Sequence, residues 1–487
     1  DPLWSRGLGD VYKRLITAQN VTVIFDGGTD LNATKTKAPV WHLNGNGNFD
    51  FVGDITAQNN SANVNNSLIL NGTGTTTLRG NNSGLNNLVY TYSGSTLAVS
   101  NSANLSALST LTLGGALKYN GTGDTFTNAL NLGGATNGSS AAVSIAQNGS
   151  GTLALTGAGS ANASARTVTL SGSTAGVGSI SGAISDGAST NTGVNTTFSG
   201  ATTLTFAGSA SPLTNSALYN IGVGATVTGA GIDAGTTVVS IDISDPLAGK
   251  IVLSKAITAN INAGQSLTFG GSTALTKNGS GQWILAGAND YTGATTINGG
   301  TLSVNGSLAS SGSVTVNSGG TLGGSGTVGN VTVNSGGVLA PGNSPGTLSV
   351  QSLTLNSGAV TSIQLAGTNS FDSINVLGSS IVYGGDLSFS LISYVPAPGD
   401  AFTVFNMTGG SRTGDFEHVS IDGFYLTDVS GVWTGIDNVA NVAYTFTDAT
   451  GVLSVATVPE PGTCAMAAIG LGALTFMVAR RRKESGE

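Results

Sequence analysis

Residues 314–320 read Val-Thr-Val-Asn-Ser-Gly-Gly, and the same phrase returns at residues 331–337. Residues 353–358 repeat it as Leu-Thr-Leu-Asn-Ser-Gly, and looser copies lie at 296–300 and 302–306. A short phrase that recurs at a period of about 20 residues is typical of a solenoid, in which each copy forms one turn of a stacked coil.

Each copy joins a strand to a turn. Side chains alternate along a strand, so Val314 and Val316 share one face and Thr315 lies on the other. Asn and Gly then favour the tight turn that follows. Strands this short are stable only when stacking buries their apolar side. We therefore predict an all-β, right-handed parallel β-helix, with these side chains pointing inward: Val314, Val316, Val331, Val333, Leu353 and Leu355.

An asparagine recurs at the same place in three copies, as Asn317, Asn334 and Asn356. Two interpretations remain open. The side chains stack as a hydrogen-bonded amide ladder, or each asparagine takes the left-handed conformation of a turn.

The composition excludes several classes of protein. Glycine accounts for 75 of 487 residues, and only 8% of residues are charged. Disorder requires low hydrophobicity and high net charge, whereas 39% of this chain is hydrophobic and its net charge is −8. An acidic chain without a basic face is not expected to bind nucleic acid. The single cysteine, Cys464, cannot form a disulfide within the chain, and we interpret it as a small apolar residue rather than a lipidation site.

The pattern of strands, turns and charges divides the chain into seven parts. Aromatic and acidic residues become more frequent after residue 383, which predicts a change from solenoid to a small antiparallel segment. We predict an N-terminal cap at 1–60, solenoid rungs at 61–195, an inserted β module at 196–270, further rungs at 271–383, a C-terminal β cap at 384–448, a linker at 449–458 and a C-terminal tail at 459–487.

Residues 274–302 carry a longer phrase. They begin with Ala-Leu-Thr-Lys-Asn-Gly-Ser-Gly-Gln-Trp-Ile-Leu and continue with Ala-Gly-Ala-Asn-Asp-Tyr-Thr-Gly-Ala-Thr-Thr-Ile-Asn-Gly-Gly-Thr-Leu. This segment resembles the autotransporter-associated β-strand repeat, and weaker likeness extends over residues 140–400. The resemblance implies a passenger-like β-solenoid. The family's phrase at 180–187 ordinarily runs directly into Leu-Thr-Lys, so the interruption between them marks the inserted module. Insertions on solenoids map to one face, which is often a binding face, and a loop without a partner is the alternative.

The C-terminal tail has three parts. Pro459, Glu460 and Pro461 precede an uncharged apolar run at residues 463–479. That run is near the lower limit of the roughly 17–25 residues that cross a bilayer as a helix. The cations that follow would stay on the cytoplasmic side, and they are Arg480, Arg481, Arg482 and Lys483.

This tail resembles the PEP-CTERM sorting signal of Gram-negative bacteria. The resemblance implies an exported protein that is first anchored in the inner membrane by one C-terminal transmembrane helix. An exosortase-type membrane protease would then act on it, and the body would reach the cell surface or the extracellular space. Export also requires an N-terminal signal peptide, which we expect to have been removed or to lie outside this sequence.

We predict no catalytic, metal or cofactor-binding constellation. His42 and His418 are too far apart in the sequence to suggest a shared site. The acidic residues at 415–437 lack the spacing of known calcium motifs, so calcium binding is the less favoured interpretation. The tryptophans could stack on sugars, but core filling is favoured, and they are Trp4, Trp41, Trp283 and Trp433.

The favoured function is that of a structural protein of the cell surface or extracellular matrix, without enzymatic activity. An adhesin that binds polysaccharide or another cell is the alternative, with an exopolysaccharide as a further partner. A polysaccharide-active enzyme on a β-helix comes third, because catalysis on sugars requires clustered carboxylates and acids are sparse in the repeats.

Overall fold

The computed structural model describes residues 13–458, apart from short internal gaps. These gaps are residues 27–28, 31–39, 57–66, 87, 106–107, 109, 134–141, 162, 192, 208–217, 219–220, 243–247 and 310–311. The described chain is all-β and contains no α-helix, only one short 3-10 helix, η1 (Ser102–Leu105).

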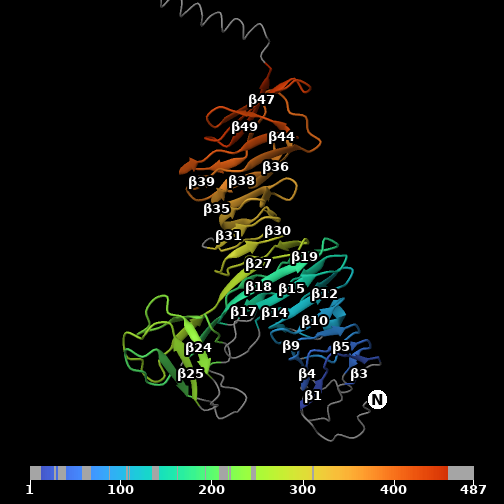
Figure 1. Cartoon of the computed structure of the whole chain (residues 1–487), viewed down its shortest axis with the longest axis vertical. Helices are drawn as coiled ribbons and strands as arrows, with labels where there is room; N and C mark the ends of the chain where they lie inside the picture. The colour runs from blue at the N-terminus through green and yellow to red at the C-terminus, as the bar shows by residue number, and fades with distance from the viewer. Residues whose placement is uncertain are drawn as a thin grey trace, which may run out of the picture.

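Three parallel sheets wind around a common core (Figure 1). The first sheet is confined to the N-terminal half, and its order is β1 (Lys13–Thr17), β4 (Val40–Asn44), β7 (Ser67–Leu70), β9 (Leu88–Thr91), β11 (Thr110–Leu113), β14 (Ala129–Leu132), β17 (Gly159–Ala161) and β20 (Ile184–Ser185).

The second sheet runs the whole length of the coil. Its main path is β2 (Thr22–Phe25), β5 (Asn48–Phe51), β8 (Thr75–Leu78), β10 (Thr96–Val99), β12 (Ala116–Tyr119), β15 (Ala142–Gln147), β18 (Ala165–Gly172), β27 (Ser272–Lys277), β29 (Thr295–Ile297), β31 (Ser313–Val316), β33 (Thr327–Val333), β35 (Thr347–Leu355), β38 (Ser373–Val376) and β42 (Phe405–Met407). Two strands extend it beside this path, β39 (Ser380–Val382) and β43 (Ser411–Thr413).

The third sheet begins later. Its order is β13 (Asp124–Phe126), β16 (Leu153–Leu155), β19 (Val177–Ile180), β28 (Gln282–Leu285), β30 (Gly300–Val304), β32 (Gly320–Gly324), β34 (Val338–Pro341), β36 (Val360–Gly367), β40 (Asp386–Leu391), β44 (His418–Ile421) and β45 (Phe424–Tyr425), with β37 (Ser370–Phe371) beside β36. A separate pair joins β3 (Thr29–Asp30) to β6 (Ile55–Thr56). Among the described strands of the three sheets, only the pairs β36–β37 and β44–β45 are antiparallel.

The core follows from alternation along the strands. Val314 in β31 pairs with Val331 in β33, which pairs with Leu353 in β35. All six residues that we predicted to point inward are at most 2% exposed, so that prediction is confirmed. Stacking in register buries the same apolar stripe on every turn and pairs the strand backbones with their neighbours. The handedness of the coil stays a prediction.

A separate β unit leaves the coil between β20 and β27 and lies to its side (Figure 1). Its strands form two small antiparallel sheets around their own apolar core. The sheets are β21 (Ala188–Asn191), β26 (Leu267–Gly270) and β23 (Thr226–Thr228), and β22 (Thr203–Ala207), β25 (Ala248–Leu253) and β24 (Val238–Asp242). The strands begin at Ala188, ahead of the predicted start at residue 196.

Beyond this unit the coil resumes where it stopped, because β27 pairs in parallel with β18, and β28 pairs with β19. The rungs also begin earlier than we predicted. Strands between residues 13 and 56, which we assigned to an N-terminal cap, already pair in parallel as rungs. Several of their inward side chains are aromatic, among them Trp41, Phe49 and Phe51. Phe25 stacks on Phe51 with ring centroids 4.4 Å apart.

At the other end, parallel pairing continues to β44, well inside the predicted cap at 384–448. A five-stranded antiparallel sheet then closes the end, in the order β41 (Ala401–Thr403), β49 (Val452–Thr457), β48 (Val442–Thr447), β47 (Val432–Asp437) and β46 (Thr427–Asp428). The predicted linker at 449–458 is therefore largely strand β49, whose Leu453 and Val455 are buried.

Candidate functional site

A ladder of asparagine side chains runs along the coil where strands of the second sheet end and turns begin. Nδ2 of Asn298 donates to Oδ1 of Asn278 at 3.0 Å. Bonds of the same kind, each 2.8 Å long, join Asn317 to Asn298, Asn334 to Asn317 and Asn356 to Asn334. The paired residues are 20, 19, 17 and 22 positions apart, so the ladder keeps its register across turns of unequal length.

Of the two interpretations open from the sequence, the amide ladder is confirmed. The left-handed conformation falls instead on the glycines two residues later, because Gly319, Gly336 and Gly358 have φ values of 82°, 73° and 72°. Three members of the ladder were predicted from the sequence, whereas Asn278 and Asn298 were not. Asn298 directly follows the strand in the looser copy at 296–300, and Asn278 directly follows the first strand of the phrase at 274–302.

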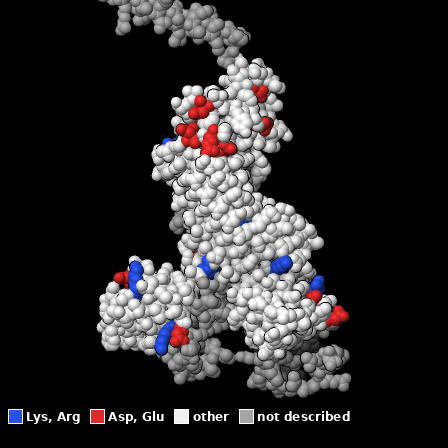
Figure 2. All heavy atoms as spheres, viewed as in Figure 1, with Lys and Arg blue, Asp and Glu red and all other residues white. Residues whose placement is uncertain are grey.

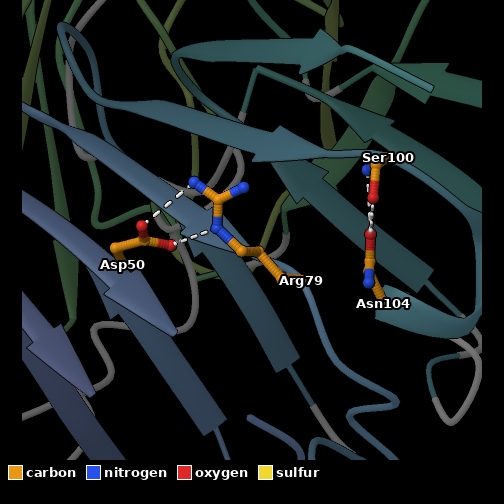
Figure 3. A network of polar contacts seen from close by, with 4 residues as sticks. All are labelled: Asp50, Arg79, Ser100 and Asn104. Atoms are coloured by element: carbon orange, nitrogen blue, oxygen red, sulfur yellow. Dashed lines mark hydrogen bonds and ion pairs between the residues drawn. The ribbon is translucent and has the colours of Figure 1, made fainter. Parts of the chain in front are cut away.

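A second set of polar contacts ties the N-terminal rungs together (Figure 3). Arg79 contacts Asp50 through two bonds, Nε to Oδ1 at 2.8 Å and an Nη to Oδ2 at 3.0 Å. The buried Asn104 accepts from the backbone N–H of Ser100 at 2.8 Å and donates to the carbonyl of Gly80 at 2.8 Å. These contacts join turn to turn and indicate a structural role.

The long phrase at 274–302 follows the inserted unit and contacts the rungs that precede it. Trp283 fills the core and donates from Nε1 to the carbonyl of Ser171 at 2.8 Å. Asn289, 3% exposed, accepts from the backbone N–H of Ile184 at 2.9 Å. Both partners precede the inserted unit. The phrase therefore closes the gap that the insertion opens in the stack.

Asp186 completes this closure from the other side. One carboxylate oxygen accepts from the N–H of Thr273, and the other accepts from the N–H and the hydroxyl of Thr292. Charge-assisted bonds of this kind are stronger than those between neutral groups. They hold the returning chain beside β20.

Lys277 belongs to the same phrase and points into the core, at the register position of Leu170 and Ile297. Its Nζ is fully buried and donates to the carbonyls of Asn278, Gly279 and Gly299 at 2.8–2.9 Å. Burial lowers the pKa of Lys277 to about 8. Every donor of the ammonium has a carbonyl partner, two in its own turn and one in the next, so we interpret Lys277 as a structural residue and not as a nucleophile.

A polar groove of about 220 Å³ crosses successive strands of the third sheet. Its floor consists of small residues that stack in register, Ser303 on Gly323 and Gly323 on Ala340. Outward-facing threonines, Thr301 and Thr321, flank this floor. The other lining residues are Gln282, Pro341, Gly342, Asn343, Ser344, Ser362, Gln364 and Asp372.

Asp372 closes one end of the groove and is 2% exposed. Its two oxygens accept the backbone N–H groups of Gly346 and Gln364, both at 2.9 Å. Burial raises the pKa of Asp372, while these two bonds lower it. Gly342 is required here, because a Cβ at that position would lie 2.3 Å from Oδ1 of Asp372.

Acidic side chains gather at the C-terminal end (Figure 2). Asp448, 5% exposed, accepts from Nε1 of Trp433 at 3.3 Å. Burial is the main reason that the pKa of Asp448 rises to about 6; the bond from Trp433 lowers it, and Asp415 and Asp428 raise it. The described residues contain no group of three or more His, Cys, Asp or Glu placed to hold a metal ion.

The histidines and tryptophans lie apart from one another. His418 contacts Asp386 at 2.8 Å, and His42 contacts Asn71 at 3.1 Å. Trp41 and Trp433 are buried like Trp283, at 7% and 5% exposure, as expected for core filling. Trp4 lies outside the described residues.

The six residues predicted to form the sorting signal, Pro459, Glu460, Pro461, Arg480, Arg481 and Arg482, also lie outside the described residues, as does the apolar run at 463–479. Within the described part of the chain, no helix is long and apolar enough to cross a membrane.

Comparison with known proteins supports the two resemblances. Residues 275–304 match the family model of the passenger-associated-transport-repeat. Residues 457–483 match the model of the PEP-CTERM protein-sorting motif. No curated protein matches the chain. The motif implies export to the cell envelope or surface and processing by an exosortase-type system. The described part of the chain is thus all-β, and the sequence combines a passenger-type repeat with a PEP-CTERM sorting motif.

The groove is not among the sites that we predicted from the sequence. Its signal was present in the phrases Thr-Leu-Ser at 301–303, Thr-Leu-Gly at 321–323 and Val-Leu-Ala at 338–340, in which a small residue follows the buried leucine. Three small residues at one repeat position indicate a depression along a stacked face.

Proposed function

We propose that the protein is an exported structural component of the cell surface or extracellular matrix. The observation that carries this proposal is the asparagine ladder between Asn278 and Asn356, which repeats a side-chain bond on every turn in addition to the backbone pairing. A stack that is bonded in this way along its axis resists bending and local opening. Those are the properties that a scaffold requires.

The chemistry of the outer surface supports the same proposal. In the turns between residues 271 and 385, the acidic residues are Asp290 and Asp372. Both oxygens of Asp372 already accept backbone N–H groups. A glycosidase or lyase requires carboxylates that face a sugar ring. We therefore propose that the protein is not an enzyme, and release of new sugar ends from any surface polysaccharide would contradict this.

The test uses the full chain in a Gram-negative host that has an exosortase. We expect the wild-type body at the surface, with mass spectrometry detecting no peptides from residues 463–487. Replacing Pro459, Glu460 and Pro461 with Ala should leave the full-length precursor in the inner membrane. The matched control replaces three exposed residues of a turn with Ala, Thr368, Asn369 and Ser370.

A structural role also predicts a mechanical effect. Matrix from cells that retain the precursor should have a lower storage modulus than matrix from control cells. An unchanged modulus, with the protein demonstrably absent from the surface, would contradict the structural proposal.

A further inference from the structure

The groove on the third sheet contains polar groups that the described protein does not use. The hydroxyls of Thr301, Thr321 and Ser362 make no hydrogen bond with any described residue. The side-chain amide of Gln364 makes none either. Gln282 uses only its Nε2, which donates to Ser303 at 3.1 Å. Donors and acceptors thus line both sides of the floor and are available to a ligand.

The shape of the groove suits a chain that lies along the coil axis. The floor crosses neighbouring rungs, which are about 4.8 Å apart in a sheet. That spacing is close to the advance of one sugar unit in an extended glycan. The volume of about 220 Å³ is below the roughly 300–1,000 Å³ that encloses a drug-sized ligand. It therefore suits part of a chain whose remainder runs over the surface.

The charge of the groove decides which glycans fit. Among the described residues that line it there is no Lys, Arg or His, and the only ionisable side chain is that of the buried Asp372. An anionic sugar would therefore meet a carboxylate without a cation to offset it. The hydroxyls of an uncharged sugar both donate and accept hydrogen bonds. The side-chain amides and hydroxyls of the groove do the same, so they complement such a sugar.

We propose that this groove binds an uncharged, linear polysaccharide, with its sugar units in register with successive rungs. Thr301 and Thr321 bind one edge of the chain, and Gln364 and Ser362 bind near the end that Asp372 closes. This binding goes beyond the structural role, because a scaffold can form a matrix without recognising a sugar.

The test is a titration of the exported form of the protein with two tetrasaccharides. Cellotetraose is the neutral probe, and tetragalacturonate is the acidic one. We expect binding of cellotetraose only. Gln282→Ala and Gln364→Ala should each weaken it about fivefold, the factor that corresponds to one net hydrogen bond of about 1 kcal/mol.

Gln351→Ala is the matched control, because Gln351 is a half-buried glutamine of β35 in the second sheet, away from the groove. A third variant, Ala340→Phe, covers the floor and should abolish binding. Unchanged circular dichroism and melting temperatures show that each variant is folded.

The proposal is overturned if cellotetraose does not bind the folded wild type. It is also overturned if tetragalacturonate binds equally well, or if the groove variants bind as tightly as the Gln351→Ala control. These readouts are independent of surface location and matrix stiffness, so failure here leaves the structural function to be judged by its own test.

Discussion

The asparagine ladder makes a quantitative prediction, because its central and terminal members lose different numbers of bonds. Asn334→Ala removes two side-chain bonds, the one to Asn317 and the one from Asn356. Asn356→Ala removes only the bond to Asn334. At about 1 kcal/mol of net stabilisation per bond, the two variants should lose about 2 and about 1 kcal/mol of local stability.

A double-mutant cycle tests whether the bonds form one ladder. Asn317→Ala and Asn334→Ala each remove two bonds, but they share the bond between them. The double variant therefore loses three bonds and should be about 1 kcal/mol more stable than the sum of the single effects predicts. Thr332→Ala, an outward-facing neighbour in β33, is the control, and we expect a change within about 0.5 kcal/mol.

Hydrogen exchange followed by mass spectrometry is the suitable assay. A long repeat array need not unfold in one step, whereas exchange reports the local opening of each turn. Peptides that cover 313–337 should exchange faster in the order control, Asn356→Ala, Asn334→Ala. Equal losses for the terminal and central variants, or additive effects in the cycle, would refute the ladder as a connected network.

Three further predictions concern the closure of the insertion and the C-terminal end. Asn289→Ala leaves the buried N–H of Ile184 without its partner, so we expect a loss of about 2–3 kcal/mol, seen as faster exchange at Ile184. Gly178→Ala places a Cβ within 2.4–2.5 Å of the Trp283 ring and should cost about 1–3 kcal/mol in thermal unfolding; an unchanged melting temperature would contradict the packing. The pKa of Asp448 is raised from 3.8 to about 6, so the folded end binds a proton more tightly than the unfolded chain. Its stability should fall as the pH rises through about 4 to 6, and Asp448→Asn should remove this dependence, as followed by exchange across β48.

The sequence was sufficient to predict the core of the repeats, for a definite physical reason. Alternation places Val314 and Val316 on one face, and a period near 20 brings Val331 beside Val314 and Leu353 beside Val331. The alternation along a strand is a local pattern, and the repeat is a periodic one. Stacking in register places equivalent residues side by side, so both patterns carry over into the structure. The ladder was predictable as one of two alternatives for the same reason, because one side chain repeats at one position.

The closure and the groove could not be predicted, because they depend on contacts between distant residues. Ile184 and Asn289 are 105 residues apart, and no repeat relates them. Asp372 reaches the groove only because β36 and β37 form an antiparallel hairpin that places it beside Gln364. The boundaries at both ends were misplaced for a related reason. Early rungs with aromatic cores and late rungs beyond residue 383 do not repeat the Val-Thr-Val phrase.

The scarcity of charge in this chain follows from the stacking itself. In-register parallel pairing places equivalent residues about 4.8 Å apart on every turn, as it does for Thr315, Thr332 and Thr354. A charged residue at such a repeated position would meet a like charge above and below, whereas an amide meets a partner. Some of the charges that do occur among the rungs contact a complementary group, as Asp50 does with Arg79 and Asp386 does with His418.

Acidic residues gather instead where parallel stacking ends, at the C-terminal antiparallel sheet and the last rungs beneath it (Figure 2). There the strands no longer repeat one position over another, and a carboxylate need not face its own copy. The low charge of 8% is therefore a consequence of repeating one rung many times. Asparagine suits a repeated polar position, because its amide can donate to the copy on one side and accept from the copy on the other.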